Sequence, residues 1–142
     1  MNLSTIPEIN FNKAITKVNS IINLWKNRSL TPIGKLTVIK TLLLSQFNHL
    51  FTSIVTPIQI LDKTNKIFFS FLWDGKPDKI HRSTIYMDPK LRGMGMTNIY
   101  IFEKSLELGW IKKIIIQPDE KSAPWYNLLK TTIVNPDNLV SL

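Results

Sequence analysis

The 142-residue chain contains no cysteine. This absence excludes disulfide bridges, thiolate zinc sites and a cysteine nucleophile within these residues. The two histidines are His49, in a helical run where a structural role is expected, and His81, in a basic loop. Neither has a second ligand at a spacing that a metal site requires. We therefore expect no metal and no cofactor in this chain.

Long apolar runs are also missing. Lys40 interrupts the best one, TVIKTLLLSQF, well short of the roughly 20 residues of a membrane helix. The N-terminal stretch MNLSTIPEINF lacks the basic region and apolar core of a secretory signal. The sequence thus predicts an intracellular protein of the nucleus or cytoplasm, neither secreted nor bound to a membrane.

Carboxylates are scarce relative to cations. Eighteen Lys and Arg stand against 10 Asp and Glu, giving a net charge of +8. The carboxylates are dispersed, and the pair Glu103 and Glu107 is expected on a solvated helix face rather than at a metal. Because no catalytic constellation emerges, we expect no enzymatic activity from this chain alone. The excess of positive charge favours an anionic partner, with nucleic acid ahead of a membrane surface.

Apolar residues make up 44% of the chain, enough for one domain with a modest core. Their steps of three and four predict helices over 10–28, from Pro32 to about residue 50, over 58–73 and from Asn98 to before Pro118. A shorter helix is predicted from Ala123. Thr31 is expected as an N-cap, and the dipeptide at 74–75 as a helix stop.

The predicted fold class is mainly α. We expect a bundle-like domain of four to five helices with one irregular basic loop or short β segment at about residues 76–97. In this interpretation residues 1–9 are an N-terminal extension and residues 10–117 form the helical domain. Residues 118–142 contribute a short helix and a frayed tail.

The densest positive charge directly follows the largest apolar residues, in FLWDGKPDKIHRSTIY at 71–86. Cations at Lys76, Lys79 and Arg82 can contact phosphates, and an aromatic ring such as Tyr86 can stack on a base or sugar. A sparser set of cations, Lys26 to Lys40, surrounds the first helix–helix junction. The charged surface of an ordinary soluble protein is an equally valid interpretation of composition alone.

The order of several short motifs is more specific than any of them. The series W-x-x-R-S-L-T-P-I-G-K-x-x-x-I-K at 25–40 precedes Pro57, FLWDGK at 71–76 and KIHRSTIY at 79–86; GMGMTNI and SLELGWIKKI follow. This order resembles the segment downstream of the polymerase palm in reverse transcriptases of non-LTR (LINE-type) retrotransposons. The resemblance covers about residues 17–116.

The resemblance implies a helical thumb that holds a primer–template duplex by its backbone. The candidate nucleic-acid-binding residues, combining this resemblance with the basic segment, are Arg28, Lys35, Lys40, Lys76, Lys79, Arg82, Tyr86 and Arg92. The candidate structural residues are Gly34, Trp73, Gly75, Gly93, Gly95 and Trp110. Arg92 stands where many relatives have a glycine, so the turn there is expected to differ.

The acidic, metal-binding motif of the polymerase palm is absent from this sequence. The resemblance therefore implies a non-catalytic piece of an RNA-directed DNA polymerase, whose partners would be an RNA–DNA hybrid or RNA and the palm of the parent enzyme. The alternative is a helical protein-interaction module or a non-functional retroelement remnant. Cations gathered on one face would favour the first interpretation, and scattered cations the second.

Overall fold

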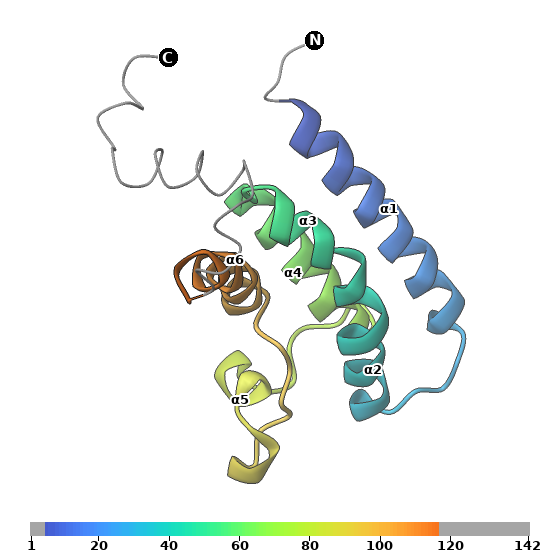
Figure 1. Ribbon diagram of the computed structural model, residues 1–142. Coiled ribbons are helices and arrows are strands. Elements are labelled where there is room, and N and C mark those ends of the chain that lie inside the picture. Colours follow the sequence, from blue (N-terminus) through green and yellow to red (C-terminus); the bar gives the residue numbers. More distant parts are fainter. Residues whose placement is uncertain (1–4, 117–142) are drawn as a thin grey trace. The chain divides into compact units, whose positions relative to one another are not determined.

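The computed structural model describes residues 5–116 (Figure 1). The chain divides into two compact units, Met1–Glu107 and Leu108–Leu142, with the boundary inside the last described helix. The account below concerns the first unit. The helix predicted from Ala123 and the tail lie outside the described residues.

Every regular element within residues 5–116 is helical, which confirms a mainly α fold. The bounds are as follows: α1 Thr5–Lys26, α2 Pro32–Val38, η1 Ile39–Leu43, η2 Leu44–Gln46, α3 Asn48–Ser53, α4 Ile58–Leu72, α5 Arg82–Tyr86, η3 Pro89–Leu91 and α6 Ile99–Ile116.

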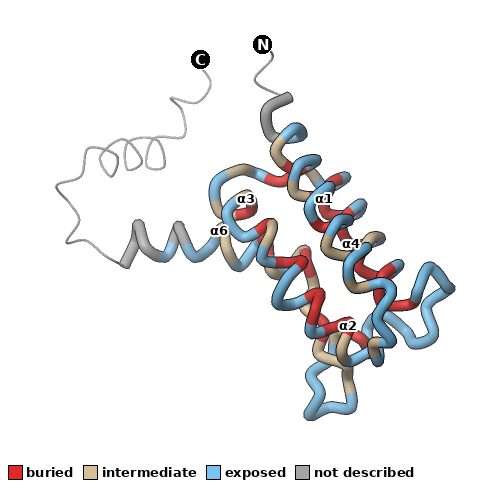
Figure 2. Tube along the Cα trace, turned by 90° about the vertical axis from the view of Figure 1, so that its right-hand side faces the viewer, coloured by how far each residue is buried: buried red, intermediate tan, exposed pale blue. Residues whose placement is uncertain are grey.

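Helix α1 packs against α4 and against the η1–η2 segment, and α2 also packs on α4. The inner faces of these helices carry the buried residues and the outer faces are exposed (Figure 2). On α1 the buried stripe is Phe11, Ile15 and Val18, as the helical spacing predicts. Phe51 of α3 stacks on Phe47 with ring centroids 5.4 Å apart, which joins the end of the η segment to the core.

The predicted helix from Pro32 begins as expected but does not continue regularly. The Thr31 hydroxyl accepts a hydrogen bond from the Gly34 N–H at 3.2 Å, the expected N-cap. The chain then passes through a π turn and a 3-10 turn before α3. The expected apolar stripe is partly wrong. Ile33, in the first turn of α2, is 73% exposed, and Leu44 is buried after the π turn has shifted the register.

The prediction of a short strand or extended chain at 83–87 is wrong, because the helix α5 forms there. Ile85 is fully buried, so core packing favours the helical turn over β propensity. The chain then reverses through η3, and the N–H groups of residues 94–96 donate to carbonyls of residues 84, 85 and 87 at 2.8–3.2 Å. These bonds make the returning chain and α5 one compact knuckle, here defined as residues 82–96.

Two positions explain how the knuckle closes. A methyl group at Gly93 would lie 2.0 Å from the Met87 carbonyl oxygen, so only glycine permits this approach. Arg92 adopts φ of 63°, a left-handed conformation typical of glycine. Arg92 thus has a backbone conformation that glycine adopts without strain, and the expected difference from relatives at this turn stays a prediction.

Gly34 is less crowded than Gly93, and no other backbone approaches it closely. The nearest atom to a methyl group at Gly34 is the capping Thr31 Oγ1, at an ordinary 3.4 Å.

Helix α6 begins at the predicted place. The Asn98 side-chain oxygen accepts hydrogen bonds from the N–H groups of Tyr100 and Ile101 at 3.0 and 3.4 Å. The expectation of a solvated carboxylate pair on this helix is wrong for Glu103, which is 1% exposed. Its carboxylate oxygens accept no hydrogen bond from the described residues, and Lys104 Nζ lies 3.5 Å from Oε2.

Candidate nucleic-acid interface

The basic segment starts from a fixed helix end. Helix α4 stops where Asp74 and Gly75 take positive φ values of 54° and 72°, which confirms the predicted stop. The Gly75 N–H donates to the Ser70 carbonyl at 2.8 Å, and the Trp73 side chain before it is buried. The basic residues that follow therefore leave the core from a rigid turn.

Lys35 is directed inward to this turn. Its ammonium lies 2.5 Å from Asp74 Oδ1 and 5.9 Å from the centroid of the Phe71 ring. The Lys35 side chain is only 10% exposed, whereas that of Asp74 is 60% exposed. The pair fastens the first turns of α2 to the end of α4, so the Lys35 charge is already compensated within the chain.

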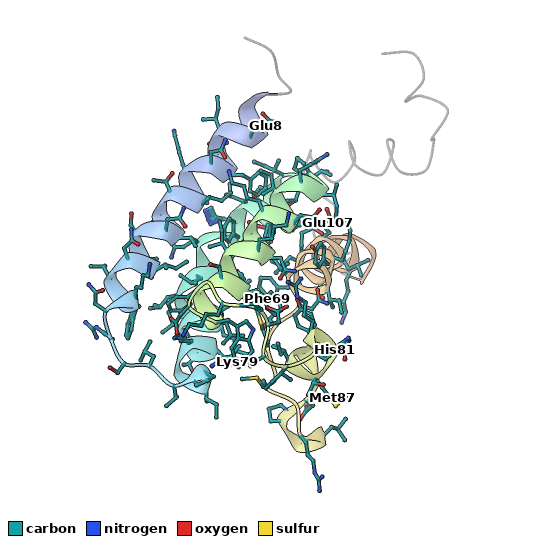
Figure 3. The ribbon with its side chains drawn as sticks, turned by 180° about the vertical axis from the view of Figure 1, so that it is seen from behind. Glu8, Phe69, Lys79, His81, Met87 and Glu107 are labelled. Carbon is teal, nitrogen blue, oxygen red and sulfur yellow. The ribbon has the colours of Figure 1, made fainter. Side chains whose placement is uncertain are left out.

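Lys76 and Lys79 follow the same turn, and both are exposed. Figure 3 shows the position of Lys79. The hydrogen bond from Lys35 lowers the pKa of Asp74, and the charges of Lys76 and Lys79 act in the same direction. Three of the candidate cations are thus close enough to act on one carboxylate. Ion pairs among the described residues engage Lys35, Arg82 and Lys104, which leaves Lys76 and Lys79 without one there.

Arg82 and Tyr86 of α5 are fixed by contacts inside the unit. Arg82 Nε donates to Asp78 Oδ2 at 2.7 Å, and its guanidinium carbon lies 4.3 Å from the centroid of the Phe69 ring. The Tyr86 hydroxyl donates to Asn65 Oδ1 at 3.2 Å, and burial raises the pKa of this phenol. The Arg82 side chain remains 51% exposed, but Tyr86 is half-buried against the core.

The other predicted cations lie apart from this turn in sequence. Arg28 is exposed after α1, with its guanidinium carbon 4.5 Å from the centroid of the Trp25 ring. Lys40 is exposed on η1, and its ammonium lies 3.6 Å from where a methyl group at Gly95 would stand. Arg92 is exposed at the tip of the knuckle. Trp110 lies in α6, where its side chain is outside the described set.

A polar cleft between α1 and α4 was missed by the sequence analysis. Its lining is Asn19, Ile22, Asn23, Lys26, Lys66, Ile67, Ser70, Phe71, Asp74 and Gly75, around a volume of about 410 Å³. A second hollow of about 420 Å³ shares Lys66, Ser70 and Gly75 with it and continues to Lys76 and Arg82. The available signal was the polar spacing on each helix, Asn19–Asn23–Lys26 and Lys66–Ser70.

An apolar groove lies beside Trp73, between the start of α2 and the basic segment. It encloses about 580 Å³ and is lined by Thr31, Pro32, Ile33, Trp73, Lys79, Ile80, Pro89, Gly93 and Met94. The indole N–H of Trp73 is buried and donates to no acceptor among the described residues. This groove joins apolar side chains of α2 to the basic segment, and Lys79 contributes a cation to its lining.

Among residues 5–116 no group of three or more potential metal-ligating side chains occurs. No helix in that range has both the length and the apolar character needed to cross a bilayer.

Comparison with known proteins yields one relative. Over 107 residues the chain is 25% identical to a protein of Arabidopsis thaliana named "Putative ribonuclease H protein At1g65750". The aligned part is 70% of this chain but only 17% of the relative, so the chain corresponds to a small part of that protein's length. No protein-family model matches the chain. No solved structure matches it.

Proposed function

We propose that this chain is a non-catalytic piece of a retroelement reverse transcriptase, and that its helical domain holds a nucleic acid by the phosphate backbone. The observation that carries the proposal is the fixed turn at Asp74 and Gly75 with exposed Lys76 and Lys79 directly after it. Cations on a rigid support lose little freedom when they contact phosphates, and such contacts position a duplex without reading its sequence.

Two further observations support the proposal. The motif order at 25–114 resembles the thumb region of LINE-type reverse transcriptases. The Arabidopsis relative carries the name of a ribonuclease, a class of enzyme that acts on nucleic acid. The proposed partners are an RNA–DNA hybrid or RNA and the polymerase palm of a longer parent protein.

The structure refines the set of residues proposed for binding. Lys76 and Lys79 are the principal candidates, because they follow the fixed turn directly, are exposed and have no ion pair among the described residues. Arg82 is a partial contributor, since Asp78 shares its charge. Lys35 and Tyr86 are proposed to act indirectly, by fixing the turn and the knuckle.

The test is a titration of a labelled RNA–DNA hybrid at several salt concentrations. The variant K76A/K79A should bind more weakly, and the slope of log K against log salt should become shallower by roughly 1.4–1.8, about 0.7–0.9 per lost phosphate contact. The matched control is K13A/K17A, which removes the same charge from exposed positions of α1. If both variants changed the slope equally, binding would reflect net charge, and the proposed interface would be wrong.

The apolar groove at Trp73 favours a second candidate function, a protein-interaction module. Its exposed Ile33 and Ile80 are features of a peptide-binding groove rather than of a phosphate contact. Ile33→Gln would reduce binding to a protein partner while leaving hybrid binding intact, because it adds no charge beside Lys79. Loss of hybrid binding in I33Q would instead place the groove within the nucleic-acid interface.

A further inference from the structure

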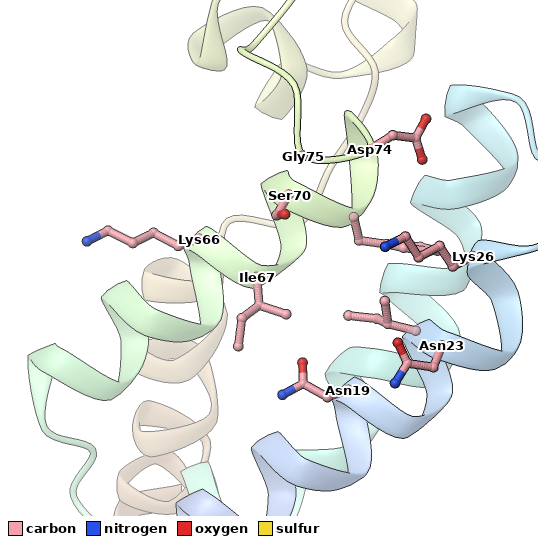
Figure 4. A pocket seen from close by; sticks show the side chains of 10 residues that line it. Asn19, Asn23, Lys26, Lys66, Ile67, Ser70, Asp74 and Gly75 are labelled. Carbon is pink, nitrogen blue, oxygen red and sulfur yellow. The ribbon is translucent and has the colours of Figure 1, made fainter.

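The cleft between α1 and α4 has the size of a ligand site. Its volume of about 410 Å³ falls within the range of about 300–1,000 Å³ that small-molecule sites occupy. Asn19 and Asn23 stand one turn apart on α1, and Ile67 projects from α4 into the space opposite them (Figure 4). Both helices therefore contribute polar and apolar groups to the cleft.

The lining combines an apolar floor with amide and hydroxyl edges. Ile22, Ile67 and Phe71 provide the apolar surface, and Phe71 itself is 5% exposed. Each asparagine offers one acceptor and an NH₂ donor, the combination that pairs with the edge of a nucleobase. A flat ring with donors and acceptors on its rim fits such a lining better than a flexible apolar chain does.

The polar groups of the cleft are not engaged elsewhere in the described part of the chain. The side-chain hydrogen bonds on α1 come from Thr16 and Ser20, which leaves the amides of Asn19 and Asn23 without side-chain partners there. Ser70 contributes its carbonyl to the Gly75 turn, and within residues 5–116 its hydroxyl has no partner. These groups are available to a ligand without breaking an internal contact.

The charge around the cleft favours an anionic ligand. Lys26 stands at the end of α1 beside the asparagines, and Lys66 extends from α4 on the side away from α1 (Figure 4). The one carboxylate in the lining, Asp74, is already paired with Lys35. From Lys66 the second hollow continues to Lys76, so cations are spaced along a path that starts at the cleft.

We infer that the α1–α4 cleft binds one unpaired nucleotide of a single strand. The base lies on the apolar floor with its edge at Asn19 and Asn23, and the flanking phosphates lie at Lys26 and along the path to Lys76. This inference rests on the proposed function and deepens it, because it adds a site for single-stranded nucleic acid beside the backbone contact.

A uracil base offers its N3–H donor, with the acceptors O2 and O4 on either side, only on the edge that a complementary base occupies. A donor-and-acceptor contact from the asparagines to uracil therefore requires an unpaired base. A base inside a duplex is also stacked on its neighbours and cannot enter a space between two helices. Fully paired RNA–DNA hybrid should therefore use the cations but not the cleft.

The decisive experiment compares two labelled probes, an oligouridylate of twelve nucleotides and a blunt RNA–DNA hybrid. N19A/N23A removes both amides without changing charge and raises helix propensity, so the fold is preserved. We expect roughly tenfold or greater loss of affinity for the oligouridylate, the scale of a lost base-edge contact, and no change for the hybrid. The matched control N12A/N27A removes two exposed asparagines outside the cleft and should change neither.

Other outcomes separate this inference from the proposed function. If N19A/N23A bound both probes like the parent chain while K76A/K79A lost the hybrid, the cleft inference would be wrong and the proposed function would stand. Equal losses for both probes in N19A/N23A would overturn the single-strand assignment. Binding of neither probe by the parent chain would overturn both.

A second measurement addresses the cleft without a change in sequence. In ¹⁵N-labelled protein, uridine monophosphate should shift the side-chain NH₂ signals of Asn19 and Asn23, whereas inorganic phosphate at the same concentration should not. Equal shifts with phosphate would reduce the cleft to an anion site and overturn the inference. Unshifted amides with both probes would overturn it as well.

Discussion

The ion pair between Lys35 and Asp74 allows a sharp prediction about stability. Lys35 is almost fully buried and Asp74 is mostly exposed, so removing the two partners has unequal consequences. Asp74→Asn keeps a side chain that tolerates the left-handed backbone at this position, but it leaves the Lys35 ammonium buried without a counter-ion. Lys35→Met keeps an unbranched side chain next to Phe71 and leaves a carboxylate that water can solvate.

The magnitudes follow from this asymmetry. A hydrogen bond to a charged group contributes about 1.5–3 kcal/mol, and a fully exposed ion pair about 0–1 kcal/mol. With one buried and one exposed partner, we expect Asp74→Asn to destabilise by about 2 kcal/mol. We expect Lys35→Met to destabilise by about 1 kcal/mol or less, since no charge remains buried. The double variant should cost about as much as Lys35→Met alone, because the stranded ammonium is gone.

The assay is urea denaturation of the parent chain, the two single variants and the double variant, with tryptophan fluorescence as the signal for unfolding. For a chain of this size each 1 kcal/mol also corresponds to a change of roughly 3–5 °C in Tm, which gives an independent check. The reasoning would be refuted if Lys35→Met were the more damaging change, or if the two effects added in the double variant. Either result would mean that the pair does not couple α2 to the end of α4.

The pH dependence of the same pair has a defined sign. Because the folded-state pKa of Asp74 is lowered, its contribution is present above the ordinary aspartate pKa and is lost as pH falls through the folded value. The difference in unfolding free energy between the parent chain and Asp74→Asn should therefore shrink in acid.

Three other changes test the knuckle and the buried carboxylate. Gly93→Ala should destabilise by about 3 kcal/mol or more, because its methyl group would overlap the Met87 carbonyl. Urea denaturation measures this loss of stability. Gly34→Ala is the control and should not destabilise. Arg92→Gly should be neutral or stabilise by less than about 1 kcal/mol, as relief of left-handed strain exceeds the added unfolded-state entropy; a clear loss of stability would show that the side chain itself holds the turn. Burial, and then the charge of Glu107, raise the pKa of Glu103, so the parent chain loses stability as pH rises above the ordinary glutamate range. Glu103→Gln should remove that loss, and an advantage over the parent that does not grow between pH 5 and pH 8 would contradict the assignment.

Local signals made much of the fold predictable. Thr31 before Pro32, the turn at Asp74 and Gly75, and Asn98 each mark a helix boundary by a side chain or backbone preference that acts within a few residues. The type of segment 83–87 was missed because β-branched residues favour extended chain, and only contact with the core reverses that preference.

The site was less predictable than the fold. Sequence identifies cations but does not show which of them are already compensated, and Lys35 is paired with a residue 39 positions away. The cleft was missed for a related reason. Each helix carries only a short polar stripe, and the two stripes form a site only when α1 packs on α4.

The π turn at Ile39–Leu43 has a consequence for comparing this chain with others. The Leu44 N–H donates to the Ile39 carbonyl, five residues back, so this turn contains one residue more than an α-helical turn. A related chain with a continuous α-helix here would need one residue fewer between the helix before the turn and the helix after it. An alignment that allows no gap inside a helix would then be displaced by one residue on one side of the turn. Such an alignment would understate the similarity of sequences that share the fold.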